Sequence, residues 1–452
     1  MSEAPAALPK PPTPSRKRRR LLAGFILSVL LLLTVALALP WLLYRFEHAR
    51  LEREAGPLRL ERFARPRMPP GNPAFQWLAA GERVRLAKAE SKTVGDAVKG
   101  GASAILASRP QLMVLLERNR EALQQALEME DGPSSLNVDY RVLGSEIPNL
   151  FPQLLLARLL HIQGLLALHA GDVAGAAAAV RSLGLQARVL QREPVYLTQR
   201  LGLYSEKLQL ILLRSIAQEA PPGADPRLDR FLLSTDLRKQ YRENITLNAV
   251  SYLQGVKEWL AKPDPRLEKA SKDEAAKAFG RLAEHWTATG LSAAAMSRYR
   301  LYLQAYDRHY EWIAQELAKD PKEMGPYEKL EDVGGPKEYD LPVIYRATSA
   351  SRLLIGACLA VRSGSLSCKD AGKLGPVDAH LRSVLKPDGS CMLRTWDGKD
   401  YLRYFKPEHS SPIPQDCTVF SPPPGSPPRT APAPADRAPG TATAPSAPAP
   451  SK

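Results

Sequence analysis

The feature that most constrains this chain is an uncharged run of 24 residues near its start, from Leu21 to Tyr44. As a helix rising about 1.5 Å per residue, the run is about 36 Å long, which is enough to cross a hydrocarbon core of about 30 Å with some tilt. The run therefore predicts a single transmembrane helix over residues 21–44.

The residues that flank this run predict its orientation. Basic residues occupy every position from Arg16 to Arg20, directly before the run, whereas the basic residues after it are offset by acidic ones, Glu47, Glu52 and Glu54. Trp41 and Tyr44 stand at its far end, where aromatic side chains favour the membrane interface. Positive charge concentrates on the cytoplasmic side of membrane proteins. We therefore expect a cytoplasmic amino terminus, with about 400 residues across the membrane.

Two alternatives to an uncleaved anchor exist. Ala36-Leu37-Ala38 offers small residues at the spacing that a signal peptidase recognises, so the run could belong to a cleaved signal peptide. Against this, the apolar run continues past Ala38 to Tyr44, and a leader of 20 residues is long for a signal peptide. The second alternative is a helix buried in a soluble core. The anchor is the preferred interpretation.

The charge balance limits the kinds of partner. The 452 residues carry a formal net charge of +15, and the first 20 contain six basic side chains and one acidic side chain, which leaves +10 beyond them. Such a surplus attracts anionic lipid headgroups or acidic envelope polymers. The alternative is that an Arg- and Ala-rich composition gives a basic protein without further meaning. The expected compartment argues against a nucleic-acid partner.

Composition divides the chain into five parts. A basic, Pro-rich cytoplasmic tail (1–20) precedes the transmembrane helix (21–44), and an extracytoplasmic α-helical domain follows over 45–340. A small α+β element that contains all four cysteines follows (341–420). The end (421–452) is rich in Pro and Ala and is predicted to be disordered. The expected fold class is mainly α: a single transmembrane helix, an α-helical domain with a helix hairpin, and a small α+β carboxy-terminal element.

Helical periodicity dominates the extracytoplasmic part. The expected helices cover Phe75–Ala89, Gln111–Leu127, Leu154–His169, a return helix from Val173, and a third helix through Leu197–Ile211. Further helices are expected from Asp225 to about Leu260, from the capping box at Ser271, and along an aromatic stripe from Tyr299 to Leu317. The glycine in Gly171-Asp172 separates the Leu-rich helix from its return helix, an arrangement typical of a tetratricopeptide-like helix pair.

The last part of the chain combines a helix with a predicted hairpin. Ala347–Val361 is apolar with helical periodicity. Alternating residues on both sides of Asp397-Gly398 predict a β-hairpin between residues 391–396 and 399–405.

Four cysteines lie in this part: Cys358, Cys368, Cys391 and Cys417. On an oxidising side of the membrane they can form two disulfides, each contributing about 2–4 kcal/mol, in any of three connectivities. Cys358–Cys368 and Cys391–Cys417 are favoured because each pair brackets a local loop; alternatively, Cys358 is a buried free thiol. Their wide spacing argues against a zinc site.

The arrangement resembles uncharacterised bacterial membrane-anchored helical proteins with a tetratricopeptide-like helix pair and a pseudopilin-like carboxy-terminal element. Ala157–Glu193 matches the helix pair, and Ala350–Gly364, Asp397-Gly398-Lys399 and Leu402-Arg403-Tyr404 match the terminal element. The Asp-Pro-Phe that precedes the Gly-Lys in such proteins is replaced here by Arg394-Thr395-Trp396. The resemblance implies no known activity, so it assigns no functional residues.

The sequence lacks the common signatures of catalysis. It has no His-Glu-x-x-His, no Gly-x-Ser-x-Gly and no Gly-Lys-Ser/Thr phosphate loop. We therefore predict no catalytic residue, metal or cofactor, and a non-catalytic interaction or scaffolding module of the bacterial cell envelope. It would be anchored in the inner membrane, with its domain in the periplasm and a protein partner.

The alternative is an envelope hydrolase acting on cell-wall or peptide substrates. It would require two converging carboxylates, or a carboxylate beside His285 or His309. The candidate carboxylates are Glu146, Glu206, Glu284 and Glu311.

Overall fold

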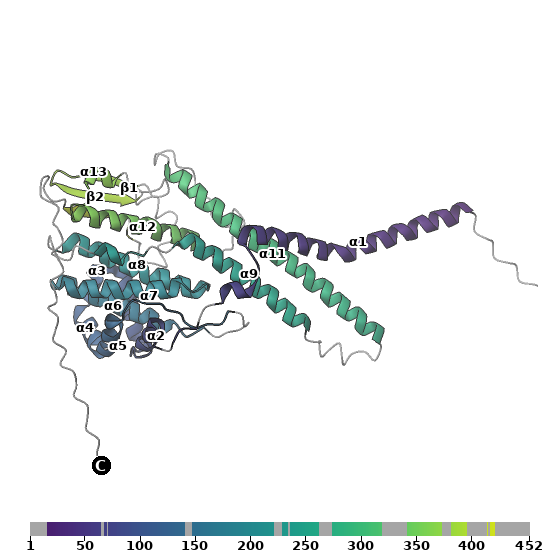
Figure 1. Ribbon diagram of the computed structural model, residues 1–452. Helices are drawn as coiled ribbons and strands as arrows, with labels where there is room; N and C mark the ends of the chain where they lie inside the picture. Colours follow the sequence, from purple (N-terminus) through teal and green to yellow (C-terminus); the bar gives the residue numbers. More distant parts are fainter. Residues whose placement is uncertain are drawn as a thin grey trace, which may run out of the picture.

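The computed structural model describes residues 16–64, 67–69, 71–140, 147–220, 228–233, 236–261, 274–318, 341–372, 381–395, 414 and 416–420. Over these residues the chain is mainly helical, with one small antiparallel sheet near the carboxyl end, which confirms the predicted fold class (Figure 1). Residues 1–15 of the predicted amino-terminal tail (1–20) and the predicted carboxy-terminal tail (421–452) lie outside the described residues, whereas residues 16–20 belong to the first helix.

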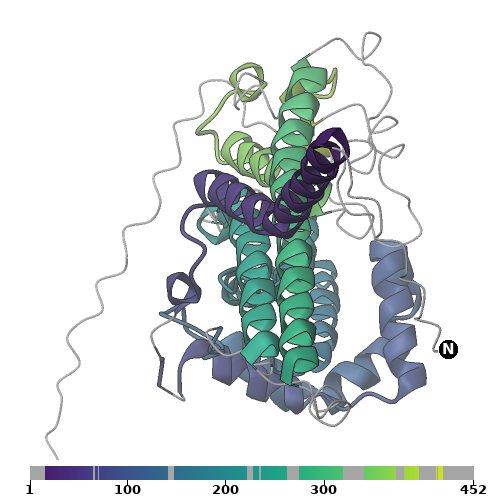
Figure 2. The ribbon, with the colours of Figure 1, turned by 90° about the vertical axis from the view of Figure 1, so that its right-hand side faces the viewer.

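The first helix, α1 (Arg16–Ala55), contains the apolar run and extends beyond it. The large apolar side chains from Phe25 to Phe46 are mostly exposed, whereas Leu51 is fully buried. The helix therefore begins as a free apolar rod and ends as part of the protein core. Figure 2 shows that α1 bends along its length; Pro40 lies inside it and is the expected cause, because proline removes a backbone hydrogen bond.

Four shorter helices follow: α2 (Pro73–Glu82), α3 (Lys88–Ala107), α4 (Arg109–Arg118) and α5 (Arg120–Glu128). The expected helix 75–89 therefore ends at Glu82, and the expected helix 111–127 is divided at Asn119. The backbone of Asn119 is not helical (φ −102°, ψ 16°), because its side chain bonds to the backbone of a separate segment instead.

The centre of the body is formed by α6 (Phe151–His169), α7 (Val173–Gln191) and α8 (Tyr196–Glu219). The predicted hairpin between the first two is confirmed: Gly171 adopts φ +82°, and the Asp172 carboxylate caps α7 by accepting from the backbone N–H of Gly175 at 2.8 Å. Two described helices are long and apolar enough to cross a membrane, α1 and α6, but most of α6 is buried inside the protein.

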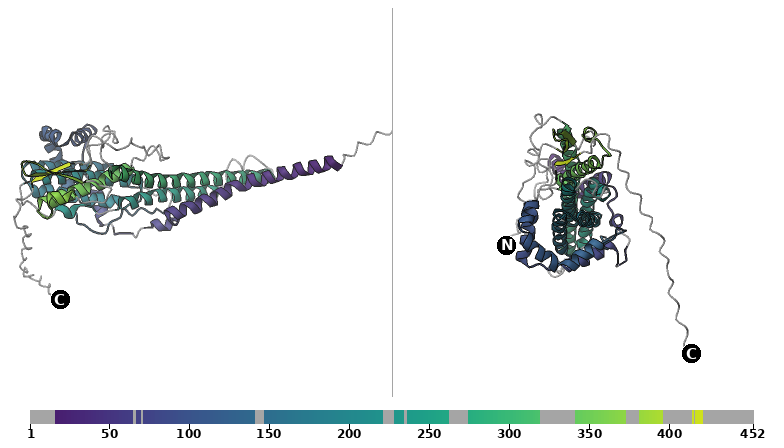
Figure 3. Two further views of the ribbon diagram at one scale, coloured as in Figure 1. Left: turned by 90° about the horizontal axis from the view of Figure 1, so that it is seen from above. Right: turned by 90° about the vertical axis from the view of Figure 1, so that its left-hand side faces the viewer.

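Two long helices, α9 (Leu237–Ala261) and α11 (Glu274–Ala318), extend from the body beside α1 (Figures 1 and 3). Short 3-10 turns occupy Leu60–Phe63 and Leu228–Phe231. Asp225 and Ser271, the predicted caps, lie outside the described residues. The helix expected from Asp225 is described only from Leu237 onward.

The carboxy-terminal element packs α12 (Leu341–Arg362) between α8 and a sheet of β1 (Leu381–Leu385), β2 (Ser390–Thr395) and β3 (Asp416–Phe420), in the order β1-β2-β3. The turn between β1 and β2 contains Asp388-Gly389, with Gly389 at φ +78°. β1 pairs with one edge of β2 and β3 pairs with the other, so no edge of β2 is left for residues 399–405. The predicted hairpin between 391–396 and 399–405 is therefore wrong. Asp397-Gly398 lies outside the described residues.

The cysteine pairing also differs from the favoured one. Cys368, in the short helix α13 (Cys368–Ala371), forms a disulfide with Cys391 of β2, while Cys358 and Cys417 are buried free thiols. Cys391 lies opposite Val419 and Cys417 lies opposite Leu393, so Cys391 and Cys417 are two positions out of register. The expected Cys358–Cys368 and Cys391–Cys417 bridges are therefore wrong, because α13 brings Cys368 to β2, whereas Cys417 faces Cys358 of α12.

Candidate functional site

The residues proposed for catalysis do not form one site in the described structure. Glu206 is fully buried on α8, where both of its carboxylate oxygens accept from Arg352 of α12. Gln191 of α7 also donates to Glu206, at 2.6 Å. Glu284 and His285 are on α11, in its part beside α1. The Glu206 carboxylate therefore has a structural partner and no access to solvent.

The side chains of the remaining candidates lie outside the description. Glu146 lies outside the described residues, and Glu311 and His309 occupy a part of α11 whose side chains lie outside the description. Within the described residues, no group of three or more His, Cys, Asp or Glu side chains is placed to hold a metal ion.

Two ionisable groups inside the helical stack have shifted pKa values. Burial lowers the pKa of His161 to about 4, so this imidazole is neutral at neutral pH while its Nδ1 contacts the Leu208 carbonyl at 3.1 Å. Burial also lowers the pKa of the neighbouring Lys207 to about 8. Neither side chain lines the cavities beside α4 and α5, so we interpret both as parts of the core.

The most distinctive concave site is a pocket lined with arginines, at the elbow between α4 and α5. Its cavity volume is about 670 Å³. We call it the arginine pocket; its lining consists of Arg83, Arg85, Glu117, Arg118, Asn119, Arg120, Glu121 and Ala122.

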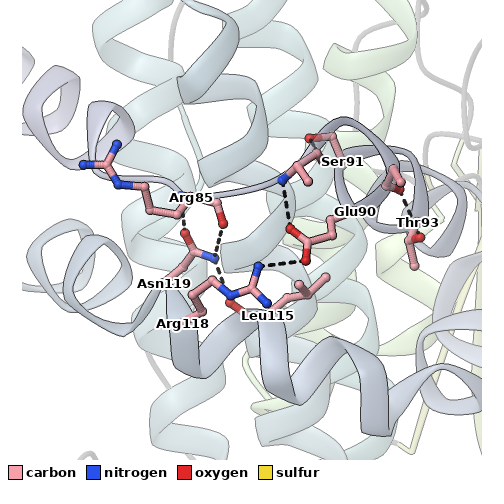
Figure 4. A network of polar contacts seen from close by, with 9 residues as sticks. Arg85, Glu90, Ser91, Thr93, Leu115, Arg118 and Asn119 are labelled. Carbon is pink, nitrogen blue, oxygen red and sulfur yellow. Dashed lines mark hydrogen bonds and ion pairs between the residues drawn. The ribbon is translucent and has the colours of Figure 1, made fainter.

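Asn119 builds this pocket. Its side-chain oxygen accepts from the Arg85 backbone N–H at 2.6 Å, and its amide group donates to the carbonyls of Leu115 at 2.8 Å and Arg85 at 3.3 Å (Figure 4). The side chain is buried, so these bonds form in a low-dielectric environment that strengthens them. They hold the segment after α2 against the elbow, which places Arg83 and Arg85 beside Arg118 and Arg120.

The four arginines differ in how far they are neutralised. Arg118 donates to Glu90 at 2.7 Å, and Arg120 lies 3.5 Å from Glu117 in an exposed pair. A hydrogen bond from the Ala87 backbone N–H, followed by the one from Arg118, holds the pKa of Glu90 below its usual range. Arg83 and Arg85 make no ion pair within the described part of the chain and are exposed to solvent. Their guanidinium groups are therefore available to carboxylates or phosphates, which arginine binds through two parallel hydrogen bonds.

An apolar groove of about 670 Å³ adjoins the arginine pocket, between α4, α5 and the end of α6. Glu117 and Arg120 line both cavities. The side chains that make the groove apolar are Met113, Leu116, Leu123, Leu127, Leu166, Ala167 and Ala170. The buried Oε1 of Gln163, another lining residue, has no hydrogen-bond partner in the described structure. The elbow therefore presents a basic pocket and an apolar groove side by side.

The arginine pocket was not predicted from the sequence. A local signal was present, since Arg83-Val84-Arg85 and Arg118-Asn119-Arg120 repeat the same alternation. The pocket forms only because Asn119 breaks the helix and binds a segment 34 residues earlier, a contact that periodicity does not reveal.

Comparison with protein-family models, curated protein sequences and solved structures finds no significant match to this chain.

Proposed function

We propose that this protein is a non-catalytic interaction module of the bacterial cell envelope, anchored in the inner membrane by α1 with its body in the periplasm. The anchor is supported by the large apolar side chains of α1 between Phe25 and Phe46, which expose between 42% and 69% of their surface. In water this rod would be a large unfavourable apolar surface; in a bilayer it matches the hydrocarbon.

The observation that carries the interaction role is the combined basic and apolar surface at the α4–α5 elbow. This elbow lies at the end of the body opposite the amino-terminal end of α1 (Figure 1). A segment docking there could place carboxylates on Arg83 and Arg85, and apolar side chains in the groove beside Met113. The partner that this surface fits best is therefore an acidic, amphipathic protein segment of the periplasm.

A binding measurement tests this proposal. It uses the full-length protein in nanodiscs and a labelled helical peptide in which pairs of Glu alternate with pairs of Leu. The Arg83→Ala/Arg85→Ala variant should bind at least tenfold more weakly, because two charge-assisted contacts are lost. Arg200→Ala removes an exposed arginine on α8 and is the matched control; it should bind like the wild type. Equal binding by the double variant, or equal binding of a Lys/Leu peptide, would exclude the proposed surface.

The compartment is tested separately. Alkaline phosphatase, which is active only outside the cytoplasm, should be active when it is fused behind residue 420. Activity of a cytoplasmic reporter at the same position, together with an inactive phosphatase fusion, would contradict the envelope location.

A further inference from the structure

Two of the four cysteines in the carboxy-terminal element face each other as free thiols. Cys358 of α12 and Cys417 of β3 are both fully buried, and their thiols are hydrogen-bonded to each other. A disulfide can form only where the two Cβ–Sγ bonds point toward each other over a short Cα separation. The thiol–thiol hydrogen bond and the direct packing of α12 on β3 give this pair both properties. The two sulfurs are therefore placed to form a bond.

The existing disulfide uses neither of these thiols. It joins Cys368 to Cys391 and so fastens α13 to β2. The sheet register places Cys391 opposite Val419 rather than opposite Cys417, so the two cysteines on neighbouring strands are not direct partners. A bond between Cys358 and Cys417 would leave the first disulfide intact and would join a different pair of elements, α12 and β3.

The closed fold keeps this pair of thiols reduced. Burial, and then the hydrogen bond with Cys417, raises the pKa of the Cys358 thiol well above its usual range, so little of the attacking thiolate is present. Reaction therefore requires β3 to open. This strand has five residues, lies at the edge of the sheet and is fastened to α8 by the ion pair between Asp416 and Arg214. Short peripheral elements open at a lower free energy than the core does.

We propose that Cys358 and Cys417 are a second disulfide site, which a small-molecule disulfide closes when β3 opens. The Cys417 thiolate attacks one sulfur of the reagent R–S–S–R, which forms a mixed disulfide and releases the first R–S⁻. The Cys358 thiolate then attacks the Cys417 sulfur and releases the second R–S⁻. The two released thiolates take up the two protons that the cysteines lose, so the protein pair is oxidised by two electrons and the reagent is reduced to two R–SH. The new bond would lock β3 to α12. The proposed periplasmic location supplies such disulfides, but the reaction itself does not depend on the anchor.

Oxidation of the native full-length protein in detergent by excess oxidised glutathione tests this inference. After treatment the protein is denatured, alkylated and weighed. The untreated protein should carry two alkyl labels, on Cys358 and Cys417, whereas the treated protein should carry none, and peptide mapping without reductant should find these two residues joined. Arg214→Ala should be oxidised severalfold faster, because β3 loses its ion pair to α8. Arg200→Ala, at an exposed position on the same helix, is the matched control and should be oxidised at the wild-type rate.

A second variant separates the proposed bond from other oxidation products. Cys358→Ser lacks the second thiol, so treatment should leave one glutathione on Cys417. Two alkyl labels that persist after treatment of both the wild type and Arg214→Ala would overturn the inference. Glutathione on both Cys358 and Cys417 of the wild type would overturn it too, as would a bond between Cys417 and Cys391. These outcomes leave the anchor and the arginine pocket unaffected, so failure here is distinct from failure of the proposed function.

Discussion

The buried ion pair between Glu206 and Arg352 joins two helices that are far apart in the sequence. Glu206 belongs to α8 and Arg352 to α12, so the pair connects the helical stack to the carboxy-terminal element. A buried carboxylate is tolerated only while it is neutralised and hydrogen-bonded, because its desolvation costs several kcal/mol. The pair therefore specifies where α12 docks, whatever its net contribution to stability.

Arg352→Met should lower the free energy of unfolding by about 3–5 kcal/mol, because Glu206 remains buried without its cation. Denaturant unfolding of the full chain in detergent measures this loss. The double variant Arg352→Met/Glu206→Gln should recover part of it, since no charge is then left unpaired. Arg200→Met, on the exposed start of α8, is the control and should change stability by less than about 0.5 kcal/mol. A loss below 1 kcal/mol in the first variant would show that the pair is solvated.

His161 predicts a specific dependence of stability on pH. Its pKa in the folded protein is about 4, against an ordinary value of 6.5. Between these values the unfolded chain binds a proton that the folded chain does not, so stability falls as the pH is lowered from about 6.5 to about 4. The shift corresponds to a loss of up to roughly 3 kcal/mol.

Denaturant unfolding at pH 7, 6, 5 and 4 measures this slope. His161→Leu should lose the contribution of this group, whereas His285→Leu, at an exposed position on α11, should keep the wild-type slope. An unchanged slope in His161→Leu would mean that other groups cause the pH dependence.

The helices were predictable from the sequence to the extent that their contacts are local. The α6–α7 hairpin was found because Leu-rich periodicity, Gly171 and the Asp172 cap all act within a few residues. The division at Asn119 and the pairing of β2 with β3 depend on contacts with distant segments, which local patterns do not encode. The predicted disulfide pairing was wrong for the same reason. Loop length favoured cysteines close in the sequence, whereas the packing of α13 on β2 brings Cys368 and Cys391 together.

The α7–α8 contact depends on glycine. A Cβ on Gly202 would lie 2.8 Å from Gln191 Cγ, 3.0 Å from the Gln191 backbone nitrogen and 3.1 Å from the Ala187 carbonyl. Gly202→Ala should therefore force the helices apart and destabilise the protein by about 1–3 kcal/mol, measured by thermal or denaturant unfolding. Gly71→Ala, where nothing lies within 4 Å of the added atom, is the control. Equal stability of the two variants would contradict the close approach of α7 and α8.

The number of free thiols in the carboxy-terminal element can be measured directly by alkylation. With Cys368 and Cys391 bonded and Cys358 and Cys417 free and buried, alkylation without reductant should add no label to the native protein. Under denaturing conditions it should add two, and peptide mass mapping should place both on Cys358 and Cys417. Reduction before denaturation should add four. Two labels on any other pair would contradict the observed connectivity, and no label would show a second bridge.

The apolar part of α1 and the body are mechanically continuous in this architecture. α1 passes without interruption from its exposed apolar part into the core at Leu51, and the Arg300–Glu47 pair fixes it to α11 on the way. The orientation of the anchor would therefore set the orientation of everything attached to it, including the arginine pocket. Under the proposed function, the side of the membrane on which the pocket acts depends on the charges that flank the apolar run.

Replacing Arg16, Lys17, Arg18, Arg19 and Arg20 with serine should reduce the fraction of chains whose body lies outside the cytoplasm, because the positive side of a span is retained in the cytoplasm. Protease added to spheroplasts measures that fraction: an exported body is digested and a retained body is protected. Replacing Arg45 and Arg53, which follow the run, should leave the digested fraction unchanged or raise it, since this removes positive charge from the opposite side. If the body of the five-residue variant is still fully digested, a determinant other than the basic cluster sets the orientation. If the body of the wild type is fully protected, the body is cytoplasmic, and the arginine pocket cannot serve a periplasmic partner.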